Sequence, residues 1–150
     1  MKLTHLIRVR VYSKEEDNEE EVLKSFLSLF PFDLEEEKLQ TENTVAEGFE
    51  NRKIRVFELI LKRTKHTKEF LDQLLEKLTK EQKQTILDQA ESRLDDKLNL
   101  FIRLDKSKLI KDNELKLTDS GDCFHIKISI AAFPAKREIA MEIVKKIFKT

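Results

Sequence analysis

Apolar and polar residues alternate along several segments of the chain, and the first of these opens the sequence. Over Leu3–Tyr12, Ile7 and Val9 alternate with Arg8 and Arg10, and this period of two is typical of a half-buried β-strand. We therefore predict a strand here and further strands, some weaker, over Lys38–Ala46, Ile54–Leu61, Leu98–Asp105, Glu114–Leu117 and Cys123–Phe133. A turn is expected at Gly48–Lys53, and the last two strands are expected to pair as a hairpin whose loop is Thr118–Asp122.

Between the strands, apolar residues recur at helical spacing. Ser13–Glu16 has the pattern of a capping box, so a helix is expected to start there and to end at Pro31. Residues 67–93 have helical periodicity, and a second capping box at Thr79–Gln82 predicts a break into two helices. A last helix is expected after Pro134, with Ile139, Ile143, Val144 and Ile147 on its apolar side.

The predicted order of elements is β-α-β-β-α-α-β-β-β-α. No repeat or long linker divides the 150 residues, so we expect a single domain over residues 1–150. Since each helix has one apolar stripe and each strand one apolar face, the natural architecture is α+β, a mainly antiparallel sheet with helices packed on one face.

Composition excludes several classes of protein. A single cysteine, Cys123, rules out an internal disulfide framework and a multi-cysteine metal site. With only Gly48 and Gly121 present, no glycine-rich phosphate or dinucleotide loop can be formed. No apolar run reaches the ~20 residues of a membrane span, and no signal peptide is visible. We expect a cytoplasmic protein without membrane association and without a cofactor.

Net charge is zero, but its distribution is uneven. Residues 1–50 contain 6 basic and 13 acidic side chains, and residues 51–150 contain 23 and 16. A neutral chain of this kind can present a local positive surface. The abundance of Lys and Glu, 21 and 19 residues, resembles the composition of proteins from thermophilic organisms.

The face of the sheet opposite the helices has the clearest candidate chemistry. Basic and aromatic side chains are expected to alternate on it: Arg8, Arg10, Tyr12, Arg55, Phe57, Phe101, Arg103, His125 and Lys127. Aromatic rings stack on unpaired bases while cations meet phosphates, which suits single-stranded RNA. Two alternatives remain open. The face is simply solvated and its cations pair with neighbouring acids, or Phe57 and Phe101 anchor a homodimer.

A second candidate lies in Phe133–Glu138, before the last helix. Lys136 and Arg137 oppose the helix dipole, which favours anions at this end. Together with free backbone N–H groups, they would form a seat for a phosphate. Alternatively, both side chains turn away and pair with acids such as Glu138 or Asp122.

No catalytic or metal site is predicted. His5, His66 and His125 lie on separate elements, and His5 is expected in the core. Cys123 and His125 share a strand face but lack a third partner. Asp119 and Asp122 are typical turn residues rather than metal ligands, and Arg103 and Asp105 are expected to form a structural ion pair.

The combination of Leu98–Lys106, Leu115–Asp119 with Asp122, and Ala132–Glu138 resembles an archaeal family described as RNA-binding or predicted to be exosome-associated. The opening strand and the following acidic helix also resemble it. The resemblance implies a fold similar to that of the ribosomal protein that holds 5S RNA, and a role in RNA processing. The positions that match the family are Arg103, Asp105, Lys106, Asp122, Lys136 and Arg137.

Our leading hypothesis is a non-enzymatic RNA-binding protein, alone or in a larger RNA-processing complex. Its expected RNA-binding residues are Arg8, Arg10, Phe101, Arg103, Lys106, Lys127, Lys136 and Arg137. The rival is a scaffold subunit or homodimer that uses the open sheet face. A more distant third is a phosphate-ester or nucleotide enzyme at Lys136 and Arg137.

Overall fold

The computed structural model describes residues 2–48 and 52–149. Over these residues the chain forms five strands and six helices. The strands are β1 (Thr4–Ser13), β2 (Glu42–Glu47), β3 (Lys53–Leu61), β4 (Asn99–Asp105) and β5 (Cys123–Ile130). The helices are α1 (Glu19–Ser28), α2 (Thr64–Lys77), α3 (Lys80–Asp88), α4 (Ala90–Arg93), α5 (Lys106–Asp112) and α6 (Arg137–Phe148).

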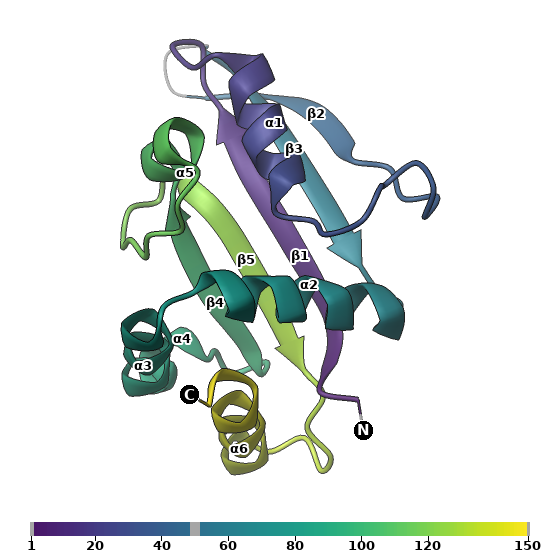
Figure 1. The fold of residues 1–150 in the computed structure, drawn as a ribbon, viewed down its shortest axis with the longest axis vertical. Coiled ribbons are helices and arrows are strands. Elements are labelled where there is room, and N and C mark those ends of the chain that lie inside the picture. Colours follow the sequence, from purple (N-terminus) through teal and green to yellow (C-terminus); the bar gives the residue numbers. More distant parts are fainter. Residues whose placement is uncertain (1, 49–51, 150) are drawn as a thin grey trace. The chain divides into compact units, whose positions relative to one another are not determined.

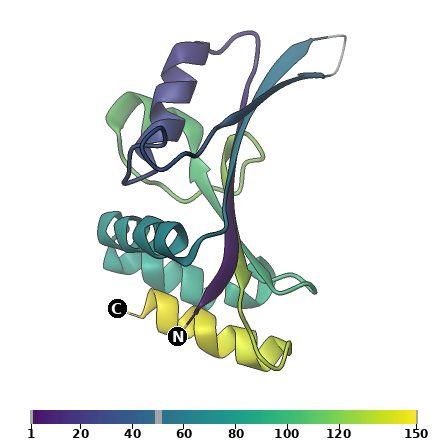
Figure 2. The same cartoon turned by 90° about the vertical axis from the view of Figure 1, so that its right-hand side faces the viewer.

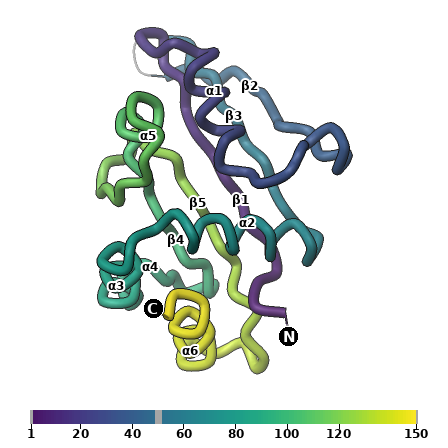
Figure 3. The backbone as a smooth tube through the Cα atoms, in the orientation of Figure 1, coloured from purple at the N-terminus to yellow at the C-terminus, as the bar shows by residue number. Residues whose placement is uncertain are grey.

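The strands form one antiparallel open sheet in the order β2-β3-β1-β5-β4 (Figure 1). The trace in Figure 3 shows β1 between two strands that are distant from it in sequence, β3 and β5. This arrangement is α+β, as the hydrophobic pattern predicts.

The chain divides into two compact units, which we describe separately. Unit 1 comprises residues 1–8, 60–102 and 126–150, and unit 2 comprises residues 9–59 and 103–125. Four strands, β1, β3, β4 and β5, contribute residues to both units. Whether the chain behaves as one domain stays a prediction.

In unit 1, helix α2 lies on one side of the strands (Figure 2). The residues that face it alternate along each strand and are fully buried, as Ile7, Leu100 and Ile126 illustrate. Helix α2 adds Phe70 and Leu74 to this core. Helix α6 adds a further set at helical spacing: Ala140, Ile143, Val144, Ile147 and Phe148. One face of these strands is therefore covered, and the other holds half-buried side chains.

In unit 2, α1 and α5 lie on one side of the strands (Figure 2). Phe26 of α1 is fully buried and contacts Phe57 of β3, with ring centroids 6.4 Å apart. Phe26 also meets Phe30 edge to face at 5.3 Å. These aromatic contacts, which add to the hydrophobic stabilisation of the core, fix α1 on β3.

The first helix begins later than its capping box predicts. Ser13 is the last residue of β1, and Asn18 caps α1 by accepting a hydrogen bond from the Glu21 N–H at 3.1 Å. The intervening residues form a loop because Tyr12 and Asp17 both bind the ammonium of Lys106. The second capping box is confirmed, since Thr79 and Gln82 cap α3 reciprocally.

The prediction for the faces of β3 is wrong. Phe57, Leu59 and Leu61 are buried on the helix-covered side, whereas Ile60 is exposed. Both faces of this strand are apolar, so alternation alone did not separate them. Phe57 belongs to the core of unit 2, and it is therefore not available as an exposed aromatic for RNA or for a dimer. His5, expected in the core, is exposed because the burial pattern of β1 shifts between Thr4 and Ile7.

The segment before β5 also differs from the prediction. Leu117 forms an isolated antiparallel bridge with Leu104 of β4, so residues 114–117 do not form a hairpin with β5. The link before them folds as α5, capped by Asp105, whose carboxylate accepts a hydrogen bond from the Lys108 N–H at 2.8 Å. Part of the predicted turn Gly48–Lys53, residues 49–51, lies outside the described residues.

Candidate nucleic-acid interface

The charge of the chain is also divided unevenly between the two units. Unit 1 contains 17 Lys and Arg against 10 Asp and Glu, a net charge of +7. Unit 2 contains 12 against 19, a net charge of −7. Because RNA is a polyanion, unit 1 is the part of the chain in which phosphate contacts are favoured.

The open face of unit 1 places a cation directly beside an aromatic ring. Ser129 of β5 donates a hydrogen bond to Asn99 of β4 at 2.6 Å, and the Ile130 N–H donates to the Leu98 carbonyl at 3.0 Å. In an antiparallel ladder each step of one residue backward along β5 corresponds to one residue forward along β4. Lys127 is consequently opposite Phe101, and both side chains are on the face that the helices leave open.

Arg8 extends this group onto a third strand. It lies on β1, which neighbours β5 in the sheet, and its position alternates with the buried Ile7 and Val9. Arg8, Lys127 and Phe101 are all half-buried. We call these three residues the open-face group.

The strands of unit 1 contain no acidic residue. The strand residues that belong to this unit, Thr4–Arg8, Ile60–Leu61, Asn99–Ile102 and Ile126–Ile130, include neither Asp nor Glu. Among the described residues, Lys127 forms no ion pair. The ammonium of Lys127 is therefore available to an external anion.

In unit 2 the predicted cations have internal partners. The Arg10 Nε donates to the Glu58 carboxylate at 2.7 Å, and Arg10 also contacts the Tyr12 hydroxyl at 3.5 Å. Partial burial lowers the pKa of Arg10, but the hydrogen bonds to Glu58 and Tyr12 outweigh it and raise the pKa overall. Arg103 is exposed and donates to the Asp119 carbonyl at 3.1 Å, so the expected ion pair with Asp105 does not form.

Lys106 is a buried member of an ion-pair network. Only 5% of it is exposed, and its ammonium lies 2.7 Å from both Asp17 and Asp122 and 2.9 Å from the Tyr12 carbonyl. Lys14 joins the network at 3.0 Å from Asp122. These three acceptors occupy the three N–H donors of the ammonium. Lys106 therefore holds the loop after β1 against α5, and none of its donors is left for a phosphate of RNA.

The network changes the acidity of its carboxylates. Burial raises the pKa of Asp17, but hydrogen bonds from Lys106 and from the Lys14 N–H outweigh it and lower the pKa overall. The pKa of Asp122 is lowered in the same way by Lys106 and Lys14, against burial. Asp122 is thus a partner of two lysines, and no cluster of three metal-ligating side chains occurs among the described residues.

The segment before α6 separates its two cations. Arg137 donates to the carbonyls of Leu94 and Glu91, at 3.0 and 2.6 Å, and so satisfies the C-terminal end of α4. Lys136 is exposed at the N-cap of α6, and its side chain forms no capping bond. The two cations do not converge on one phosphate seat in this conformation.

The thiol of Cys123, the single cysteine, lies in an environment that does not suit a nucleophile. Cys123 is buried. Burial raises the pKa of its thiol, and the charge of Arg103 only partly opposes this. A raised pKa keeps the sulfur protonated near neutral pH, whereas nucleophilic cysteines need the thiolate.

Two residues with unusual exposure, one aromatic and one with a hydroxyl, were not identified from the sequence. Phe133 is 95% exposed at the start of the link to α6, and Thr4 is buried where β1 begins. Phe133 directly precedes a proline, whereas β5 ends at Ile130, three residues before the end of the predicted strand. Thr4 offered no signal, because its surroundings come from residues distant in sequence.

These features define a surface of cationic and aromatic side chains on an open antiparallel sheet, and the comparisons with known proteins agree with that class. A family model described as RNA binding matches residues 6–130. The chain belongs to this RNA-binding family. It is 29% identical over 142 residues, 95% of this chain and 92% of the relative, to the protein of Pyrococcus abyssi named RNA-binding protein PAB1135.

Solved structures show the same fold. The chain resembles protein AF2318 from Archaeglobus fulgidus with a TM-score of 0.85 and 29% identity, covering 96% of this chain and 99% of that one. It also resembles Mth689, a DUF54 protein from Methanothermobacter thermautotrophicus, with a TM-score of 0.78 and 30% identity over 98% of this chain and 99% of that one. These similarities support the family membership and name no catalytic activity.

Proposed function

We propose that this protein binds RNA, without catalysing a reaction, through the open-face group of unit 1. The observation that carries the proposal is the placement of Lys127 opposite Phe101 on neighbouring strands. A base stacked on the Phe101 ring would leave its phosphate within the reach of a lysine side chain from the next strand. Aromatic rings bind unpaired bases, and lysines bind phosphates as point charges.

The polar neighbours of this group suit RNA. Ser129 and Asn99 lie two residues along the two strands from Lys127 and Phe101. Their hydroxyl and amide can exchange hydrogen bonds with a base edge or with a 2′-hydroxyl, and contacts to the 2′-hydroxyl allow a protein to distinguish RNA from DNA. Arg8 supplies a second charge on β1.

The other predicted RNA-binding residues contribute less to this proposal. Lys106 and Arg137 are bound to groups of the protein, and Arg10 is paired with Glu58. Arg103 and Lys136 are exposed, and we expect them to add charge at the margin. That any of these residues contacts RNA stays a prediction.

Broader parts of the hypothesis also remain proposals. We propose a role in RNA processing in the cytoplasm, with the exosome as the expected complex, and a fold related to the ribosomal protein that holds 5S RNA. None of the helices in the described part of the chain has the length and apolar character needed to span a membrane. The alternative of a homodimer through the open face keeps Phe101 but loses Phe57, which is buried.

A fluorescence-anisotropy titration tests RNA binding directly. A labelled single-stranded RNA is titrated with the protein at about 50 and about 200 mM salt, and the affinity should fall as salt increases, with a slope of about −0.7 for each phosphate neutralised. An affinity below detection at both salt concentrations, for single-stranded and for hairpin RNA, would contradict the proposed function.

A further inference from the structure

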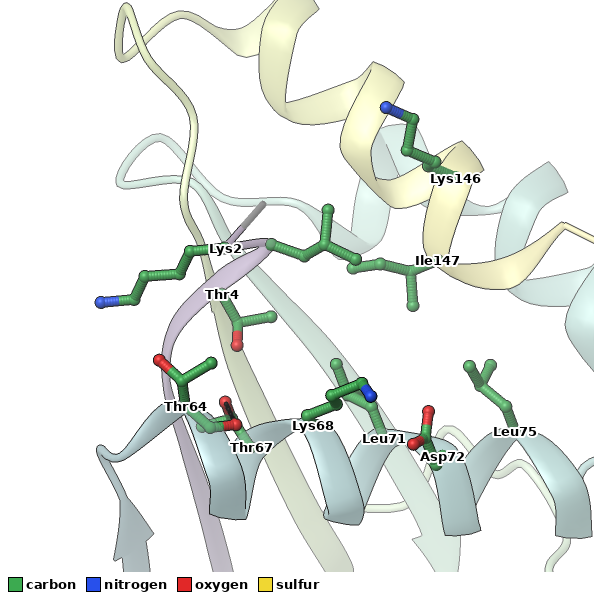
Figure 4. A pocket seen from close by; sticks show the side chains of 11 residues that line it. Lys2, Thr4, Thr64, Thr67, Lys68, Leu71, Asp72, Leu75, Lys146 and Ile147 are labelled. Atoms are coloured by element: carbon green, nitrogen blue, oxygen red, sulfur yellow. Dashed lines mark hydrogen bonds between the residues drawn. The ribbon is translucent and has the colours of Figure 1, made fainter.

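A cavity of about 270 Å³ opens in unit 1 where the start of β1 meets α2 and α6. Its floor is apolar, formed by Leu71, Leu75 and Ile147, while three threonine hydroxyls gather at one end (Figure 4). It is smaller than the roughly 300–1,000 Å³ of pockets that enclose drug-sized ligands. Its size and its apolar floor therefore suit one small, partly apolar group.

One of the threonines presents an unsatisfied hydroxyl to this cavity. Thr4 is only 3% exposed, it lines the cavity, and among the described residues its hydroxyl has no hydrogen-bond partner. Thr67, equally buried at 3%, donates its own hydroxyl to the Thr64 carbonyl at 3.2 Å. The Thr4 hydroxyl is open to the cavity, so a ligand that hydrogen-bonds to it would gain a contact there.

The entrance of the cavity is positively charged. Lys2, Lys68 and Lys146 line it, from the chain start, α2 and α6, with Asp72 as its one acid. None of the three lysines forms an ion pair among the described residues. An apolar cavity with hydroxyls inside and cations at the entrance matches a planar base that carries a phosphate.

An adjoining hollow continues this surface toward an exposed ring. It shares Lys2 and Lys146 with the cavity and is lined by Ile139 and Phe133. Phe133 is 95% exposed, so its ring is accessible to a ligand. A nucleotide adjacent to the one in the cavity could stack on it.

We propose that this cavity binds one unpaired nucleotide, with its base against the apolar floor and its phosphate on the lysines at the entrance. The inference rests on the proposed RNA binding, since we expect the nucleotide to be part of an RNA chain. A free nucleoside monophosphate has the same chemistry, and the experiment must separate the two sources. The cavity is distinct from the open-face group, with which it shares no residue.

The first arm of the experiment uses uridine 5′-monophosphate and follows the methyl resonances of Thr4, Leu71 and Ile147 by NMR. Saturable shifts are expected with the monophosphate, and weaker ones with uridine or inorganic phosphate alone. Thr4→Val and Lys68→Gln should each weaken binding about three- to tenfold. Lys77→Gln, on the same helix but outside the cavity, is the matched control. The Lys68 variant also decides the result if Thr4→Val does not fold.

The second arm compares two RNA hairpins that differ by one bulged nucleotide. The bulged hairpin should bind more tightly, and Lys68→Gln or Phe133→Ala should remove the difference. If the monophosphate binds but the bulge has no effect, the source is a free nucleotide and the RNA assignment of the cavity is wrong. If RNA binds through Lys127 and neither the bulge nor the monophosphate matters, this inference fails while the proposed function stands. If no RNA binds, the proposed function fails and the first arm alone decides the cavity.

Discussion

Lys127 of β5 lies opposite Phe101 of β4 on the sheet face that the helices leave open. The register that places them together is fixed by the Ser129–Asn99 hydrogen bond of 2.6 Å and by the backbone bond from Ile130 to Leu98. A charge and an aromatic face on adjacent strands are the minimal pair needed to hold one nucleotide of a single strand.

Replacing Lys127 with Gln should weaken RNA binding through charge alone. We expect a loss of roughly two- to fivefold at low salt, because the lysine is a single solvent-facing cation. The slope of log affinity against log salt should become shallower by about 0.7, since one phosphate contact is lost. Anisotropy titrations at several salt concentrations measure both quantities.

The matched control for this variant is Lys80→Gln. Lys80 is an exposed lysine at the start of α3, away from the open-face group. Its replacement with Gln removes the same charge from the same unit. An equal loss of affinity in the two variants would mean that net charge, and not the position of Lys127, determines binding.

Replacing Phe101 with Leu should weaken the binding of single-stranded RNA and leave the salt slope unchanged. Loss of a stacked base costs about 1–3 kcal/mol of binding free energy, and leucine preserves most of the packing at this half-buried position. Titrations with single-stranded RNA and with a blunt duplex of the same sequence make the comparison. A loss of similar size for both RNAs would argue against a stacking role.

Replacing Lys106 with Met should destabilise the protein without altering its affinity for RNA. The lysine is 5% exposed, and its loss removes a donor from the Tyr12 carbonyl and leaves Asp17 with the Lys14 N–H. We expect a loss of about 1–3 kcal/mol in the free energy of unfolding, less than for a fully buried pair because Asp122 is 42% exposed. Urea denaturation and RNA titration of the same variant test both parts, and a specific loss of RNA affinity in the folded variant would restore Lys106 as a binding residue.

The same network predicts a dependence of stability on acid. The pKa values of Asp17 and Asp122 are lower in the folded protein than the ordinary value of 3.8, mainly because Lys106 overcomes the effect of burial. The unfolded chain then binds protons more readily, so the stabilisation is complete above about pH 4 and is lost as the pH falls through the lower folded values. The free energy of unfolding from pH 6 to pH 2 should fall more steeply in this range for the wild type than for Lys106→Met. Parallel curves would show that these carboxylates are not the source.

We also expect the chain to unfold in one transition, as a single domain. Four strands contribute residues to both compact units, so loss of one unit would interrupt strands of the other. Urea denaturation followed by far-UV circular dichroism and by fluorescence of the single tyrosine, Tyr12, should give coincident curves. Two separate transitions would show that the units are independent domains.

The features of the fold that depend on local sequence patterns could be predicted. The inward faces of β4 and β5 follow from strict alternation, as in Leu100–Ile102 and Ile126–Ile128, and this alternation also places Phe101 and Lys127 on the open side. The faces of β3 could not be assigned, because both are apolar and only the contacts of Phe57 with Phe26 and of Glu58 with Arg10 distinguish them.

Contacts between distant residues account for what the sequence does not predict. Asp17 and Lys106 are 89 positions apart, and their ion pair buries a lysine that composition alone would place on the surface. The cavity near Thr4 likewise combines the first strand with α2 and α6. Neither the pairing nor the cavity has a local pattern that could reveal it.

Photo-crosslinking tests most directly whether RNA lies on the open face of unit 1. A single-stranded RNA that contains 4-thiouridine is irradiated with the protein, and the crosslinked peptides are identified by mass spectrometry. We expect crosslinks at Phe101 and on the neighbouring stretch of β5 around Lys127, and their loss in Phe101→Leu. Crosslinks confined to the acidic unit 2, with none on β4 or β5, would contradict this account.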